Sequence, residues 1–154
     1  MGINENVQHI QKTSIKPITK KHEQVIDALE LMLEQGIPDH TMSELASNLK
    51  VSLRTLYEIA PSKDHLIRMT IDRILRKLGK DALDAVANIE SPIEKLGKYL
   101  EHANQAVGPK FKVYLQSLGN NNKSKEMIDF HENYITSYTK ELLDAAVKNK
   151  EIKK

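Results

Sequence analysis

The sequence predicts an all-α protein, in which a three-helix helix-turn-helix domain is followed by a short helical domain. Apolar residues recur every three or four positions through most of the chain, as on one face of a helix. Glycine (6) and proline (5) are scarce among the 154 residues. Ser or Thr precedes several apolar stripes, where its side chain can cap a helix. We expect an N-terminal arm at residues 1–17, a helix-turn-helix domain at 18–63 and a second helical domain at 64–154.

The first predicted helix spans residues 19–35 and is expected to contribute one face to the core. Its apolar residues recur at helical spacing. They are Val25, Ile26, Leu29, Met32 and Leu33. Gly36 suits the position just after the helix, because glycine tolerates the left-handed backbone conformation.

The next stretch predicts two short helices joined by a tight turn. Thr41 can cap the first helix, and Glu44 three residues later completes a reciprocal capping box. Residues 50–51 make the turn, and Ser52 can cap the second helix. Pro61 ends it, since proline disfavours the helical conformation in the preceding residue. The second helix leaves a narrow outward face that fits the DNA major groove. The residues of this face are Leu53, Arg54, Thr55, Tyr57 and Glu58.

From residue 25 to about residue 83 the chain resembles the N-terminal domain of the TetR (tetracycline-repressor-like) transcriptional regulators. The resemblance is carried by VIDALELMLEQG, HTMSELA and VSLRTLYEIAPSKDHL, in that order. It implies a ligand-responsive regulator, usually a repressor, that binds a palindromic operator in double-stranded DNA as a homodimer. It also implies a small-molecule effector site in the second half of the chain, which is similar to the family only in the layout of its helices.

The resemblance assigns DNA contacts to matching positions of the motif. Thr41 corresponds to a residue at a helix N-terminus, where a phosphate can bind. Thr55 corresponds to a small polar residue that faces the groove. Tyr57 and Lys63 correspond to phosphate-binding positions, although Lys63 can equally be a solvated surface lysine.

Three further residues of the second short helix are expected to act near DNA. Arg54 is the expected base reader, because a guanidinium pairs bidentately with guanine O6 and N7. Leu53 can supply an apolar contact to a thymine methyl group. Ser52 is expected to act mainly as a helix cap.

The sequence departs from the family pattern directly after this motif. Glu58, Ile59 and Ala60 stand where the family commonly has a basic or polar residue, then His or Tyr, then Phe. Glu58 can accept a hydrogen bond from cytosine N4, or it can repel phosphate. Ala60 removes a large core side chain, which Ile59 can partly replace by turning inward.

The second half of the chain predicts four helices. They are expected at residues 62–89, 91–107, 111–118 and 123–148. Gly108 and Pro109 are expected to end the second of these, because proline lacks the amide hydrogen that a helix needs. Gly79 interrupts the long first helix, where it either permits close packing or a kink, or is tolerated at an exposed site.

Aromatic and histidine side chains of this half are candidate ligand contacts. The candidates are Tyr99, His102, Phe111, Tyr114, His131, Tyr134 and Tyr138. The alternative is that they belong to the core, as aromatic residues at helical spacing usually do. His102 and His131 do not form a metal-ligand pattern, so neither a metal nor another cofactor is expected.

Charge and composition limit the classes of function. The formal charge is +2, but residues 1–63 hold seven Lys/Arg against eight Asp/Glu, so the predicted DNA-binding part is not basic overall. The chain has no cysteine, and no apolar run approaches the roughly 18 residues of a membrane span. Together with the lack of an apolar signal-peptide core, this predicts a cytoplasmic protein without a membrane partner.

Two alternatives remain open at this point. The chain can be a helical binding or adaptor protein that has the same fold but lacks specific operator recognition. An enzyme is not expected, because the sequence offers no cysteine nucleophile, no Gly-rich phosphate loop and no convincing Ser/His/Asp set.

The N-terminal arm at residues 1–17 is expected to be without regular structure or to touch DNA through its lysines. Members of the family usually continue with two more helices that form a dimer interface. The sequence is therefore expected either to be truncated at a turn of the family fold or to belong to a short member that dimerises through other surfaces.

Overall fold

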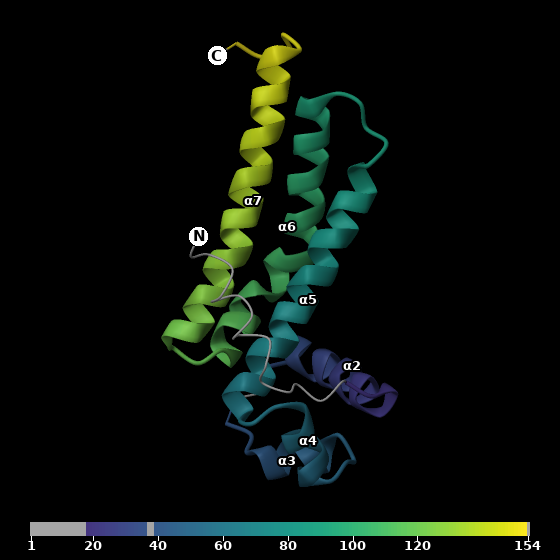
Figure 1. Cartoon of the computed structure of the whole chain (residues 1–154), viewed down its shortest axis with the longest axis vertical. Coiled ribbons are helices and arrows are strands. Elements are labelled where there is room, and N and C mark those ends of the chain that lie inside the picture. Colours follow the sequence, from purple (N-terminus) through teal and green to yellow (C-terminus); the bar gives the residue numbers. More distant parts are fainter. Residues whose placement is uncertain (1–17, 37–38, 154) are drawn as a thin grey trace, which may run out of the picture.

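The computed structural model describes residues 18–36 and 39–153, and every regular element in these ranges is an α-helix. The helices are α2 (Lys20–Glu34), α3 (Met42–Asn48), α4 (Leu53–Ile59), α5 (Lys63–Val86), α6 (Pro92–Ser117) and α7 (Asn122–Lys148). The all-α prediction is confirmed for these residues, whereas the predicted arm at 1–17 lies outside them. Figure 1 shows α5, α6 and α7 side by side, with α2, α3 and α4 around the lower end of α5.

The predicted caps set the boundaries of the first helices. The Thr41 hydroxyl accepts a hydrogen bond from the Glu44 amide at 3.1 Å, and the Glu44 carboxylate accepts one from the Thr41 amide at 3.2 Å. The Ser52 hydroxyl accepts one from the Thr55 amide at 3.1 Å. These bonds satisfy amides that have no partner within their own helix. Gly36 follows α2 with a φ of 88°, as its position predicts.

The main core joins the first four helices to parts of the two helices that follow. Leu29 of α2, Leu45 of α3, Leu56 of α4 and Ile71 of α5 are all completely buried in it. Tyr114 of α6 belongs to the same cluster. The apolar core is therefore continuous across the domain boundary predicted at 63/64.

A second, smaller core lies farther along α5. It consists of Ala82 and Val86 of α5 and Tyr99 of α6. Tyr138 of α7 packs against it, with its ring 4.7 Å from the Tyr99 ring in an edge-on arrangement. The two cores together hold α5, α6 and α7 against one another at separate levels of the bundle.

The expected break at Gly108 and Pro109 is wrong, because α6 is one helix from Pro92 to Ser117 with Pro109 inside it. A proline inside a helix removes one hydrogen bond and costs about 3 kcal/mol. Buried residues on both sides of it, Tyr99 and Tyr114, tie the two halves of α6 to the bundle. Their burial offsets that cost. Figure 1 shows that α6 changes direction along its length, as a proline in a helix usually causes.

The apolar side of α7 is covered only in part. Leu142 and Ala146 are buried near its end. Several other apolar residues of this helix are exposed by more than a third of their surface. They are Phe130, Tyr134, Ile135 and Leu143. In the part of the chain that the structure describes, no helix has the length and hydropathy needed to cross a membrane.

The stability of this fold can be tested at α2 with two leucines that differ in burial. Leu29 is 0% exposed and Leu31 is 66% exposed. We expect Leu29→Ala to lower the free energy of unfolding by about 2–5 kcal/mol, because it leaves a cavity in the main core. Leu31→Ala is the control and should change it by less than about 0.5 kcal/mol. Urea denaturation followed by circular dichroism measures both, and equal losses would contradict the packing of α2.

Candidate functional site

The outward face of α4 is the first candidate site. Arg54 is 89% exposed in its side chain, and Leu53 and Tyr57 are also exposed. The opposite side of the helix is anchored in the main core by Leu56, while Ile59 packs against its edge. Ala60, the next residue, is buried in the same core. The exposed side chains therefore stand on a helix whose orientation is fixed.

Thr55 does not belong to this face, and its predicted outward position is wrong. Its relative exposure is 6%, and its hydroxyl lies 2.8 Å from the hydroxyl of Ser52. Its amide is the one that Ser52 caps. The third residue of the helix is held inside the capping turn, which the sequence spacing does not reveal. Thr55 therefore belongs to the capped first turn of α4, and its side chain does not lie on the exposed face of the helix.

Glu58 is bound by side chains of this chain. His22 Nε2 donates a hydrogen bond to Glu58 Oε2 at 3.2 Å, and Arg54 Nε lies 3.3 Å from Glu58 Oε1. The His22 hydrogen bond, opposed by slight desolvation and aided by the Arg54 charge, holds the pKa of Glu58 below its ordinary value. The carboxylate is thus bound by side chains of the chain itself, and its two expected roles at DNA stay predictions.

His22 is fixed by the cap of α2 and by Glu58 at the same time. The Thr19 amide donates to His22 Nδ1 at 3.4 Å, and the His22 amide donates to the Thr19 hydroxyl at 3.2 Å. Because Nδ1 accepts a hydrogen bond, this pattern assigns the ring proton to Nε2, which faces Glu58. His22 therefore connects the start of α2 to the outward face of α4, although 36 residues separate it from Glu58.

The two remaining DNA-contact candidates lie at helix starts. Thr41 is exposed while its hydroxyl caps α3. Lys63 is the first residue of α5 and is partly exposed, directly after the exposed Pro61 and Ser62. Both positions leave the side chain accessible to a phosphate.

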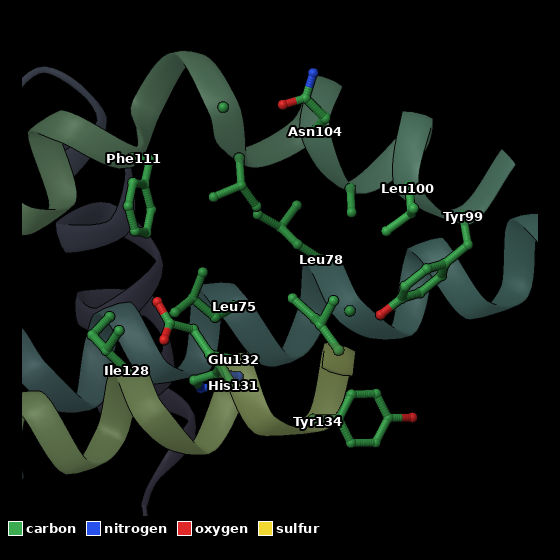
Figure 2. A pocket seen from close by; sticks show the side chains of 15 residues that line it. Leu75, Leu78, Tyr99, Leu100, Asn104, Phe111, Ile128, His131, Glu132 and Tyr134 are labelled. Carbon is green, nitrogen blue, oxygen red and sulfur yellow. The ribbon is translucent and has the colours of Figure 1, made fainter. Parts of the chain in front are cut away.

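A cavity between α5, α6 and α7 is the second candidate site. Its volume is about 470 Å³, within the range of small-molecule sites. Figure 2 shows side chains from all three helices around it. The lining residues are Leu75, Leu78 and Gly79 of α5, Tyr99, Leu100, Ala103, Asn104, Val107, Gly108 and Phe111 of α6, and Ile128, His131, Glu132, Tyr134 and Ile135 of α7. The cavity lies between the two cores, because Leu75 to Gly79 separate Ile74 of the first from Ala82 of the second.

Four of the predicted ligand residues line this cavity. Tyr99 and Phe111 face it from α6, and His131 and Tyr134 from α7. Burial, with smaller effects from Tyr134 and Tyr138, raises the pKa of Tyr99, so its hydroxyl remains protonated and can donate a hydrogen bond.

The other three predicted ligand residues do not line it. Tyr114 is 2% exposed and belongs to the main core. Tyr138 packs on Tyr99 outside the lining. His102 borders a separate shallow hollow with Ala85, Val86 and other residues. The sequence spacing placed all three on helices correctly, but it does not specify which neighbouring helix each side chain meets.

Sequence reasoning missed the α5 floor of the cavity and its single carboxylate, Glu132. Gly79 belongs to the floor, and a Cβ atom there would meet no atom within 4 Å. The signal for Glu132 was present, since an acidic residue follows His131 inside the apolar side of α7. The sequence does not show that α5 and α6 lie across the cavity from Glu132, so the position of this carboxylate could not be predicted.

His131 is held at the edge of the cavity by Asp72 of α5. Its Nε2 donates to Asp72 Oδ1 at 2.7 Å, and Arg76 Nε donates to the other carboxylate oxygen at 2.8 Å. Although burial opposes it, these two hydrogen bonds hold the pKa of Asp72 below its ordinary value. The Arg76 guanidinium also lies over the Phe130 ring, 5.2 Å from its centre. These contacts fasten α7 to α5 beside the cavity.

The comparisons with known proteins add no relative. No protein-family model matches the chain, and neither the curated proteins nor the solved structures give a significant match. The described residues also contain no group of three or more His, Cys, Asp or Glu side chains placed to hold a metal ion. The function is therefore argued from the two sites themselves.

The Asp72 contact predicts a pH-dependent stability. A carboxyl group with a lowered folded-state pKa stabilises the fold above its unfolded-state pKa and loses this effect as pH falls through the folded value. We expect Asp72→Asn to lower the free energy of unfolding by about 1–3 kcal/mol at pH 6, because two charge-assisted bonds weaken. The deficit should shrink below about pH 4.

Asp81→Asn is the control for this measurement. Asp81 is an exposed carboxylate of the same helix. Urea titrations of both variants at pH 6 and pH 3 should show a pH-dependent deficit for Asp72→Asn only. An equal deficit of Asp72→Asn at both values would show that the substitution disturbs packing instead of removing charge.

Proposed function

We propose that this chain is a DNA-binding transcriptional regulator, a ligand-responsive repressor that acts as a homodimer on a palindromic operator. The observation that carries the proposal is the exposed Arg54 on a short helix whose opposite side is anchored in the core. Such a helix can enter the major groove while Arg54, the proposed base reader, stays exposed toward a guanine. The resemblance to the TetR family in the same residues supports this reading.

The surroundings of α4 offer the contacts that position a helix on DNA. Tyr57 is exposed on α4, and Thr41 and Lys63 are accessible at the starts of α3 and α5. A hydroxyl group, a phenol and an ammonium group are suited to phosphate oxygens, which orient a protein without reading sequence. Leu53 adds an exposed apolar group beside Arg54 for a thymine methyl group.

The Glu58 pair fits this function. In the absence of DNA the charge of Glu58 is balanced by Arg54, and the His22 hydrogen bond holds the carboxylate toward α2. Arg54 is held by one contact to a single carboxylate oxygen on the protein surface, and such exposed pairs contribute little. A guanine that offers two acceptors can therefore replace Glu58 as its partner.

The ligand response is attributed to α6. Phe111 lines the cavity, and Tyr114 about one turn later is buried in the core that holds α2. Lys110 binds Glu34 of α2 at 2.7 Å. A ligand that favours another position of this segment thus favours another position of α2, whose His22 contacts α4. In a dimer this shifts the population in which both recognition helices match major grooves about 34 Å apart.

A homodimer would use exposed apolar side chains of the bundle. Leu115 of α6 and Leu143 of α7 are exposed and do not line the cavity. They lie near opposite ends of the α6–α7 hairpin, so each would serve as a separate point of contact.

A second candidate function is a helical binding protein without operator recognition. It is favoured by the same Arg54–Glu58 pair, which occupies the base-reading side chain in the absence of DNA, and by the net charge of −1 over residues 1–63. The two functions differ in one measurable property, namely sequence-specific binding to duplex DNA.

Selection from a library of random DNA duplexes tests the proposal. We expect a palindromic duplex to be enriched, and fluorescence anisotropy at two salt concentrations to show tighter binding to it than to a scrambled duplex. Arg54→Ala should weaken binding to the enriched duplex by about 10- to 100-fold, the value of one bidentate guanine contact, and should relax its specificity.

Lys80→Ala is the matched control, since it removes an exposed positive charge from α5 away from the two short helices. Its affinity for the enriched duplex should remain unchanged. If no duplex is enriched, or if the affinity is equal for both duplexes and depends only on salt, the chain is not a sequence-specific regulator.

A further inference from the structure

The cavity has an unusual charge for an apolar site. Glu132 is the only Asp, Glu, Lys or Arg among its lining residues. Figure 2 shows its carboxylate projecting from α7 into the space between the helices. No described residue forms an ion pair or hydrogen bond with this carboxylate, whereas the carboxylates of Glu58 and Asp72 are both paired.

We propose that the cavity binds a lipophilic monovalent cation, an aromatic or aliphatic molecule with one quaternary or delocalised positive charge. This inference rests on the proposed ligand response, because it names the chemical class of the effector at the same site. The cation would be placed beside Glu132, and its apolar part would lie on Leu75 and Leu78 of α5.

The aromatic residues of the cavity suit such a ligand. Phe111 faces the cavity from α6, and Tyr134 lines it from α7. The face of an aromatic ring attracts a cation, with a larger gain where water is excluded. Phe111 and Tyr134 are exposed by 37% and 47%, so both residues have surface left for contact with a ligand. The Glu132 carboxylate and the two rings, which belong to α6 and α7, would all attract a positively charged ligand.

The same features disfavour other ligand classes. An anion would be placed near Glu132 with no Lys or Arg in the lining to balance it. A neutral apolar ligand would cover Glu132 and remove water from a carboxylate that has no partner, which costs free energy. His131 does not supply the missing positive group, because its Nε2 is already bound to Asp72 at 2.7 Å. Only a cation both fills the apolar space and pairs the carboxylate.

The size of the cavity excludes inorganic cations as the main occupant. About 470 Å³ lined mostly by apolar side chains is the space of a drug-sized molecule. A small hydrated metal ion needs several oxygen ligands, and among the lining residues one carboxylate is supplied. The ligand must therefore carry its charge on an apolar body.

Three matched probes test the charge requirement directly. They share a naphthylmethyl group and differ only in the substituent, which is trimethylammonium, its neutral isostere tert-butyl, or sulfonate. Titration calorimetry with the full chain and no DNA measures their affinities. We expect the ammonium probe to bind at least about tenfold more tightly than the neutral probe, and the sulfonate probe to bind most weakly.

Glu132→Gln separates the charge from the shape of the site. It should lower the affinity for the ammonium probe to that for the neutral probe and leave the neutral probe unchanged or slightly tighter. Glu141→Gln is the control, because Glu141 is an exposed glutamate of the same helix that does not line the cavity. Phe111→Leu keeps an apolar side chain in place but removes the ring, and it should weaken the ammonium probe more than the neutral one.

The outcomes distinguish this inference from the proposed function. Equal affinities for the ammonium and neutral probes overturn it, as does an ammonium affinity that Glu132→Gln leaves unchanged, or no binding of any probe. DNA selection with the ligand-free chain tests the regulator separately. If probe binding depends on Glu132 but no DNA duplex is enriched, the cation site is retained and the regulator is rejected. If a duplex is enriched but no probe binds, the regulator is retained and the cation site is rejected.

Discussion

The burial of one side of α5 is the constraint on which the rest of the structure depends. Toward its N-terminus this helix contributes to the core that holds α2, α3 and α4, and toward its C-terminus to the smaller core with α6. Thr70 shows how complete the burial is, since its hydroxyl is fully enclosed and donates to the Leu66 carbonyl at 2.7 Å. Because α5 belongs to both cores, the short helices α3 and α4 and the cavity are parts of one packed framework.

The helices themselves were largely predictable from the sequence, because capping and apolar spacing are local. The caps at Thr41 and Ser52 and the stop at Gly36 lie where the residues predict them. Pro109 shows the limit of local reasoning. Its cost is known from the sequence, but the buried tyrosines that offset it act through residues of other helices, which no local pattern reveals.

The sites were less predictable than the helices for the same reason. Thr55 was assigned to the exposed face from its spacing, yet the Ser52 cap draws it inward. The partner of Glu58 is a histidine on a different helix, and the cavity floor comes from α5 while its walls come from α6 and α7. Phe111 lines the cavity, as a ligand-contact residue would, and its contact with a ligand stays a prediction. The position of Tyr114 depends on how α6 meets α2.

The carboxylates at the two sites, Glu58 and Glu132, differ in whether side chains of the chain itself already bind their oxygens. Glu58 has one oxygen bound by His22 and the other by Arg54, so this carboxylate needs no external positive charge. Glu132 is exposed at a mostly apolar cavity and has no partner among the described residues, so our proposal places an external positive charge there. If a ligand in the cavity changes the position of α6, then a cation paired with Glu132 also changes the position of α2. The position of α4, which carries Arg54, changes in turn. The affinity difference between the two states of α6 sets the upper limit of this coupling, because a ligand shifts an equilibrium only by its differential binding.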